Sequence, residues 1–334
     1  MSFRSSTPIF VAGHRGMVGS AVVRRLRALG FESVICRSRA ELDLTDPVAV
    51  RSFLRETKPE LMVIAAARVG GIVANNSYPA DFIRENLLIQ TNLIQYAFDN
   101  GVQRVLFLGS SCIYPRDAQQ PICESALLTG PLEPTNRAYA LAKIAGIEMC
   151  WSYNRQFRGQ SRTTFLAAMP TNLYGPGDNY HPENSHVIPG LIRRFHEAKR
   201  YAIPKVTVWG SGTPRREFMH ADDMAAACVH LMLLDNLQWT SLIAADRNDG
   251  EPPVVNIGVG EDLTISELAT LIAEVVGFTG LIDFDRSRPD GTLRKLMSNK
   301  KLSSIYSFKP RSLRQGLEQT YRIFQDYEET SPGY

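Results

Sequence analysis

Residues 9–19 read IFVAGHRGMVG, so a short apolar run leads directly into three closely spaced glycines. The run Ile9–Ala12 predicts a buried strand. The apolar residues after the loop recur at helical spacing, at Val18, Val22, Leu26 and Leu29. Glycines at these positions suit a tight turn, a close approach to a pyrophosphate and close packing of helix on strand, and a helix N-terminus binds anions. The stretch therefore predicts a dinucleotide-binding unit, with an ordinary strand–turn–helix connection as the alternative.

Further apolar runs repeat this alternation along the first half of the chain. Strand-like runs are found at Val34–Cys36, Leu61–Ala67, Val105–Leu108 and Phe165–Met169. Helical periods separate them, as at Phe82, Leu88, Asn92 and Tyr96. Asp46 before Pro47 predicts a helix start, because a polar cap precedes a proline at the first helical position. Strands that alternate with helices imply βαβ units, so we expect an α/β fold with a Rossmann-like, doubly wound parallel sheet.

The pattern changes after about residue 173. Asn172–Asn184 is rich in Gly, Pro, Asn and His and predicts a long functional loop. A helix is expected over Ile188–Lys199, followed by a strand pair, Val206–Gly210 and Arg216–His220, around a turn. Val254–Ile257 predicts a late strand that returns to the main sheet.

Signals beyond this point predict a smaller C-terminal α/β domain. Thr264 and Glu267 form a capping box that opens a helix over Ile265–Val276, and Trp239–Pro253 is the best candidate for a surface excursion. The expected division is a Rossmann domain over residues 1–174, with a returning segment at about 218–258, and a substrate domain over 175–217 and 259–334.

Composition excludes several classes of protein. The 334 residues are 44% hydrophobic and 21% charged, which provides a core, and the longest uncharged apolar run, Met224–Leu234, is too short to span a bilayer. The net charge of +3 comes from scattered residues, mostly arginine, so we expect no nucleic-acid partner but a small anionic ligand. Five cysteines without a CxxC pair predict reduced thiols in a cytoplasmic enzyme. Neither His181 nor His186 has neighbours at metal-ligand spacing, so no metal is expected.

The end of the second predicted strand bears on the cofactor. Proteins that bind NAD place an acid there, which binds the ribose diol. This chain instead carries Arg37 and Arg39, and Arg15 adds a positive charge from the glycine loop. Arginines bind the 2′-phosphate that an acid would repel, so the pattern predicts NADPH. The alternative is that Arg37 and Arg39 form a solvated strand end.

Tyr139 and Lys143 stand one helical turn apart in the run YALAK. A nearby ammonium is expected to favour the phenolate and to lower the pKa of Tyr139, which makes a usable general acid or base. The spacing is frequent by chance. Its value comes from its place downstream of the glycine loop and of the predicted strand end Leu108–Cys112.

Together these motifs resemble the extended short-chain dehydrogenases/reductases that act on nucleotide sugars, and among them the 3,5-epimerase/4-reductases of GDP-sugars. The matching blocks are GHRGMVGSA (13–21), AAARVGGIVANN (65–76), GSSCIYP (109–115), EPTNRAYALAKIAG (133–146), PTNLYGPGDN (170–179), NSHVIP (184–189), VWGSGTPRREF (208–218) and PDGTLRKL (289–296). The resemblance implies NADPH-dependent conversion of GDP-4-keto-6-deoxy-D-mannose to GDP-L-fucose, by epimerisation at C3 and C5 and hydride reduction at C4. It also implies that the second domain binds the GDP-sugar.

The resemblance assigns roles by position. The implied catalytic residues are the reductase triad Ser110, Tyr139 and Lys143, the epimerisation base Cys112 and the epimerisation acid His186. The implied cofactor-binding residues are Gly13, His14, Arg15, Gly16, Met17, Val18, Gly19, Arg37, Arg39, Leu108, Gly109, Ser110, Ser111, Tyr139, Lys143, Pro170, Thr171, Asn172, Leu173 and His186. The implied substrate-binding residues are Ser110, Cys112, Tyr139, Asn172, Arg194, Trp209, Arg216, Asp290 and Lys295.

The family commonly pairs through two helices, here Ala80–Asp99 and Ala138–Gln156, so a homodimer with a four-helix interface is expected. Apolar residues on these helices are Leu88, Leu93, Ile94, Ile147 and Tyr153.

Three alternatives stay open. Cys112 could be a packed hydrophobe, and the chain could be a dehydratase or a 4-epimerase that retains NAD. It could also be a non-catalytic NADP sensor, although such a protein would typically lose the Tyr139 and Lys143 pair.

Overall fold

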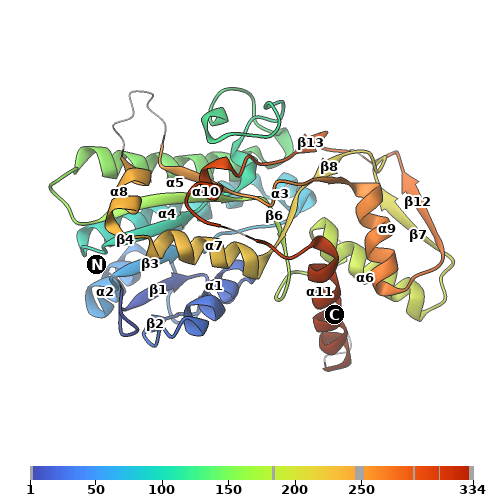
Figure 1. Cartoon of the computed structure of the whole chain (residues 1–334), viewed down its shortest axis with the longest axis horizontal. Helices are drawn as coiled ribbons and strands as arrows, with labels where there is room; N and C mark the ends of the chain where they lie inside the picture. Colours follow the sequence, from blue (N-terminus) through green and yellow to red (C-terminus); the bar gives the residue numbers. More distant parts are fainter. Residues whose placement is uncertain (1–2, 183–184, 245–251, 289, 308, 331–334) are drawn as a thin grey trace.

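A parallel sheet lies at the centre of the computed structural model, which describes residues 3–182, 185–244, 252–288, 290–307 and 309–330 (Figure 1). Over these residues the sheet has six strands in the order β10-β5-β4-β3-β1-β2. The strands are β1 (Ile9–Ala12), β2 (Val34–Ile35), β3 (Leu61–Ile64), β4 (Arg104–Leu108), β5 (Thr164–Pro170) and β10 (Val254–Ile257). The predicted parallel sheet is confirmed, including the late strand β10, which pairs with β5.

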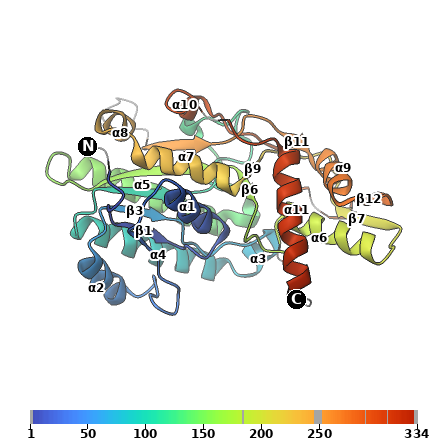
Figure 2. The same ribbon diagram turned by 60° about the horizontal axis from the view of Figure 1, so that its bottom comes forward.

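Side chains of these strands alternate between two apolar layers, because successive residues of a strand point to opposite faces. Ile9 and Val11 belong to the layer with α1 (Met17–Ala28) and α7 (Ala221–Leu233), and Phe10 belongs to the opposite layer. That opposite layer contains α2 (Pro47–Thr57), α4 (Pro79–Asp99) and α5 (Arg137–Gln156). Figure 2 shows α1 and α7 side by side. Helices therefore cover both faces, which explains the continuous apolar runs.

A separate apolar cluster occupies the other end of the molecule (Figure 1). It is built from α6 (Val187–Arg200), β7 (Lys205–Trp209), α9 (Ile265–Val276), β12 (Leu281–Asp285) and α11 (Leu313–Thr330). The predicted capping box of α9 is confirmed: the Glu267 N–H donates to Thr264 Oγ1 at 3.0 Å, and the Thr264 N–H donates to Glu267 Oε2 at 2.7 Å.

The predicted strand pair Val206–Gly210 and Arg216–His220 is wrong. Strand β7 pairs in parallel with β12. The following residues form β8 (Arg215–Arg216), between β11 (Leu263–Thr264) and β13 (Arg294–Lys295), and β9 (Phe218–His220), which pairs with β6 (Asn172–Tyr174).

Glu217, between β8 and β9, explains this crossing. It is fully buried, and its carboxylate accepts the N–H groups of Val259 at 2.6 Å, Gly260 at 2.7 Å and Met297 at 3.0 Å. The side chain thus fixes three backbone segments that a hairpin would not bring together.

The predicted surface excursion Trp239–Pro253 is only partly described. Its start lies in helix α8 (Asn236–Ile243), where Trp239 is buried and its indole donates to Thr164 Oγ1 at 2.9 Å, so this part is not an excursion. Residues 245–251 lie outside the described part of the chain. The remaining elements are α3 (Ile72–Ser77), α10 (Lys300–Ser303) and the 3₁₀ helices η1 (Ser111–Ile113), η2 (Glu124–Ala126) and η3 (Pro134–Asn136). Within the described ranges, no helix combines the length and apolar character that crossing a membrane requires.

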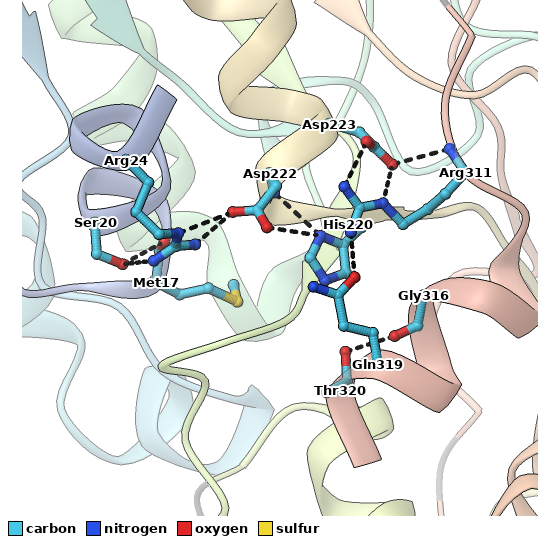
Figure 3. A network of polar contacts seen from close by, with 10 residues as sticks. All are labelled: Met17, Ser20, Arg24, His220, Asp222, Asp223, Arg311, Gly316, Gln319 and Thr320. Carbon is cyan, nitrogen blue, oxygen red and sulfur yellow. Dashed lines mark hydrogen bonds and ion pairs between the residues drawn. The ribbon is translucent and has the colours of Figure 1, made fainter. Parts of the chain in front are cut away.

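A polar network joins α1, α7 and the start of α11 (Figure 3). Arg24 of α1 forms an ion pair with Asp222. The Arg311 guanidinium donates two hydrogen bonds of 3.0 Å to the Asp223 carboxylate. His220 caps α7 by accepting the Asp222 N–H at 3.2 Å, and burial lowers its pKa to about 4, so it is neutral. The network ties the C-terminal helix to the first helix of the Rossmann unit.

We expect Asp223→Asn to lower the free energy of unfolding by about 2 kcal/mol, since it removes charge-assisted hydrogen bonds from a largely buried arginine. The two side chains are 14% and 25% exposed. Urea unfolding measures the loss. The matched control is Asp283→Asn, whose pair with Lys205 is 53% exposed on both sides and should lose almost nothing. Equal losses in the two variants would contradict the assignment of Asp223 as a structural tie.

Candidate active site

The glycine loop forms the floor of a cavity of about 810 Å³ at the carboxyl edge of the sheet. Gly13 has a φ of +87°, and a Cβ there would lie 2.6 Å from the backbone nitrogen of Ala66. A Cβ at Gly19 would lie 2.2 Å from the Gly13 carbonyl oxygen. Both positions therefore require glycine, as the sequence pattern predicts.

The N-terminus of α1 faces this cavity without a cap. Its N-cap residue is Gly16, which offers no side-chain acceptor, and its first turn holds no acidic residue. Helix α2, by contrast, is capped by Asp46, which accepts the N–H groups of Val48 and Ala49. The free N–H groups of α1 make a site for a phosphate. A dinucleotide thus fits the chemistry of the loop.

Arg15, Arg37 and Arg39 are three of the four arginines that line the first cavity, and Arg68 is the fourth. The nearby Glu41 carboxylate already accepts two hydrogen bonds from Ser38, one from its N–H at 2.7 Å and one from its hydroxyl at 2.6 Å. These bonds hold the pKa of Glu41 low, so it stays a carboxylate bound to its own loop. Arg37 and Arg39 therefore line the cavity after the second strand and Glu41 does not, although Asp43 of the same loop also lines it.

A second cavity of about 630 Å³ contains the predicted chemical groups. It is lined by Ser110, Ser111, Cys112, Tyr139, Asn172, Arg194, Trp209, Arg216, Asp290 and Lys295. Gly70 and His186 line both cavities, so the two adjoin there. His186 is the N-cap residue of α6. A ligand in one cavity can therefore reach a ligand in the other at His186.

Local structure positions the chemical groups. Ser110 ends the segment after β4 and caps η1, where its Oγ accepts the Cys112 N–H at 3.5 Å. Tyr139 and Lys143 lie one turn apart on α5, and the Lys143 ammonium donates to the Leu108 carbonyl at 2.8 Å. Lys143 is 3% exposed and lines neither cavity.

Burial shifts the ionisation of these groups toward their neutral forms. It raises the pKa of the Cys112 thiol and the Tyr139 phenol and lowers that of Lys143 to about 8. It also lowers the pKa of His186. The expectation that Lys143 lowers the pKa of Tyr139 is therefore wrong, because burial raises that pKa and the group that opposes burial is Ser110 and not Lys143.

The predicted cofactor residues divide between the cavities. Gly13–Gly19, Arg37, Arg39 and His186 line the first, whereas Ser110, Ser111, Tyr139 and Asn172 line the second. Some predicted residues border neither cavity in the described structure: Leu108, Gly109, Lys143, Pro170, Thr171 and Leu173.

Sequence reasoning assigned no role to several lining residues. Asp178 borders the first cavity, where burial raises its pKa to about 7, and Glu133 and Asn75 border the second. All three stand in blocks that carried the resemblance, which is the signal that could have found them.

Comparison with known proteins gives consistent matches. The profile of the NAD dependent epimerase/dehydratase family matches residues 9–241. GDP-L-fucose synthase 1 of Arabidopsis thaliana is 55% identical over 316 residues, 95% of this chain and 92% of that one. GDP-L-fucose synthase of Escherichia coli (strain K12) is 51% identical over 331 residues, 98% of this chain and 100% of that one.

A solved structure is also similar along the whole chain. The GDP-L-fucose synthetase of Naegleria fowleri bound to NADP is 26% identical, with a TM-score of 0.85 over 100% of this chain and 98% of that chain.

Proposed function

The chain belongs to the NAD dependent epimerase/dehydratase family, and we propose that it converts GDP-4-keto-6-deoxy-D-mannose to GDP-L-fucose with NADPH. The reaction is epimerisation at C3 and C5 followed by reduction at C4. The observation that carries the proposal is that the two cavities adjoin at His186 and that Cys112 and Tyr139 line the second cavity together with it. One cavity suits a dinucleotide and the other a nucleotide sugar.

Epimerisation requires a base, an acid and a site for an oxyanion. The C4 ketone acidifies the protons on C3 and C5, and loss of either proton leaves an enolate at O4. Ser110 and Tyr139 would donate hydrogen bonds to O4, because burial keeps the phenol protonated. Cys112, as a thiolate, would take each proton onto its sulfur, and His186, entering the step as an imidazolium, would deliver a different proton to the other face.

The same oxyanion site serves the reduction. NADPH, when bound, supplies the hydride that goes to C4. Tyr139 would then give its proton to O4. Lys143 is held 2.8 Å from the Leu108 carbonyl and would stabilise the Tyr139 phenolate that results.

The rest of the second cavity suits a nucleoside diphosphate. Arg194 and Arg216 line it and supply the cations that a diphosphate requires. Trp209 is 51% exposed, so its ring can stack on a base. We assign these residues, with Asn172, Asp290 and Lys295, to the GDP-sugar.

We propose that each of the two domains expected from the sequence holds one of the two ligands. Residues 1–174, with about 218–258, would hold the cofactor, and residues 175–217 and 259–334 would hold the GDP-sugar. The cytoplasmic location expected from the cysteines stays a prediction.

The half-reactions separate the proposed roles. In deuterated water without NADPH, Tyr139→Phe should still incorporate deuterium at C3 and C5 of the ketone, though more slowly, since one enolate donor is lost. Cys112→Ala should incorporate almost none, yet it should bind NADPH and reduce the unepimerised ketone slowly. Proton NMR or mass spectrometry measures the label.

Exchange at the wild-type rate in Cys112→Ala would mean that Cys112 is a packed hydrophobe and that the base is another residue. Stoichiometric oxidation of NADPH by the wild-type protein distinguishes the proposed reaction from a dehydratase, a 4-epimerase or a sensor.

Cofactor choice gives a second test. We propose that Arg37 and Arg39, with Arg15, bind the 2′-phosphate that distinguishes NADPH from NADH. Arg39→Ala should therefore weaken NADPH binding by about tenfold or more while NADH binding changes little. Fluorescence titration measures both dissociation constants. Equal losses for the two cofactors would remove the argument.

The oligomeric state of the protein provides a third test. We propose a homodimer in which α4 and α5 of two copies form a four-helix interface. Leu88 and Leu141 are exposed on these helices, but Leu93, Ile94 and Ile147 are buried in the protomer core and lend no support. Light scattering at micromolar concentration should give twice 37.3 kDa. A mass of one chain would overturn the proposal.

A further inference from the structure

Glu133 is a carboxylate that the proposed mechanism leaves unused, although it lines the cavity of the GDP-sugar. It is the N-cap residue of η3, and its two oxygens accept hydrogen bonds of 3.4 Å from Thr135 and Thr292. A cavity for an anionic substrate gains nothing from another negative charge unless that charge acts on a neighbouring group.

The neighbouring groups are cations. Lys295 of β13 stands in register with Arg216 of β8, and both side chains line the same cavity as Glu133. Thr292, which binds Glu133, lies three residues before Lys295 on the segment that leads into β13. Two cations on paired strands repel each other, and burial further disfavours the charge on each.

The positive charge of Lys295 lowers the pKa of the Cys112 thiol. Among the groups that face the thiol, Lys295 opposes the effect of burial on its pKa most strongly, ahead of the Ser110 hydrogen bond and of Lys143. Burial and Arg216 lower the pKa of Lys295, and the Cys112 thiolate and Glu133 raise it. Tyr139 and His186 also line this cavity.

We propose that Glu133 is a positioning residue that keeps Lys295 in its charged form, and that Lys295 in turn supports the thiolate of Cys112. The proton balance is simple: the thiol proton of Cys112 passes to the neutral amine of Lys295, so the pair gains no net charge. Glu133 favours the ionic form of the pair because its charge attracts the ammonium. The inference rests on the proposed function, because it requires Cys112 to be the epimerisation base, and it adds how the thiolate of that base is stabilised.

The test measures the thiolate directly and needs no substrate. Iodoacetamide alkylates thiolates, and peptide mass spectrometry separates Cys112 from the more accessible Cys36 and Cys123. At pH 7, Lys295→Met should slow alkylation of Cys112 by about tenfold, equivalent to about one pKa unit. Glu133→Gln should slow it by about threefold or more. NADPH titration checks that each variant is folded.

The decisive comparison uses an arginine, which does not lose its proton. Lys295→Arg should keep Cys112 reactive, and adding Glu133→Gln to it should change nothing further. The matched control is Asp290→Asn, since Asp290 lines the same cavity and acts on Arg216 but not detectably on Lys295. It should leave alkylation of Cys112 unchanged.

An effect of Glu133→Gln that persists in the Lys295→Arg background would overturn the inference. So would an equal effect of Asp290→Asn, or a loss in Lys295→Arg as large as in Lys295→Met. Failure of the proposed function is distinguishable, because deuterium exchange in Cys112→Ala tests the base and alkylation tests only how its thiolate is supported.

Discussion

Burial of ionisable side chains in and around the second cavity is the constraint on which the rest of the site depends. Cys112, Tyr139 and Lys143 are all shifted toward their neutral forms, because charge is costly where solvent is excluded. Neutral donors that already point at a substrate oxygen stabilise a negative charge as it develops there, without reorganisation. The same exclusion of water makes the proposed base, Cys112, costly to ionise, so in the proposed mechanism the cations around it would take part in the chemistry as well as in substrate binding.

The fold brings these groups together because the segments that carry them follow strands that end at one edge of the sheet. The glycine loop follows β1, and the segment with Ser110 and Cys112 follows β4, so both lie at the carboxyl edge of the parallel sheet. His186 comes from the other apolar cluster, where it begins α6 and borders both cavities. The buried Glu217 ties three backbone segments together at the crossing between the two clusters. The proposed catalytic residues are thus brought together by contacts between segments that are distant in sequence.

Sequence predicted the features that depend on local chemistry. The strand, glycine loop and helix at Ile9–Ala28, the caps at Asp46 and Thr264, and the return of β10 are all found in the structure. The pairing of β7 with β12 was missed, because the partner strand is remote and a turn between two apolar runs resembles a hairpin. The pKa of Tyr139 was predicted in the wrong direction because spacing on a helix does not reveal burial. Glu133 was missed because Thr292, which donates to it, and Lys295 are both remote from it in sequence.

The measurement that tests the central claim most directly is the isotopic pattern of the product of one complete turnover. The wild-type enzyme is supplied with GDP-4-keto-6-deoxy-D-mannose and unlabelled NADPH in deuterated water, and proton NMR identifies the sugar. One site that performs both chemistries predicts GDP-L-fucose with deuterium at C3 and C5 and protium at C4, where the unlabelled NADPH delivers its hydride. An unepimerised 6-deoxy sugar without deuterium at C3 and C5 would contradict it.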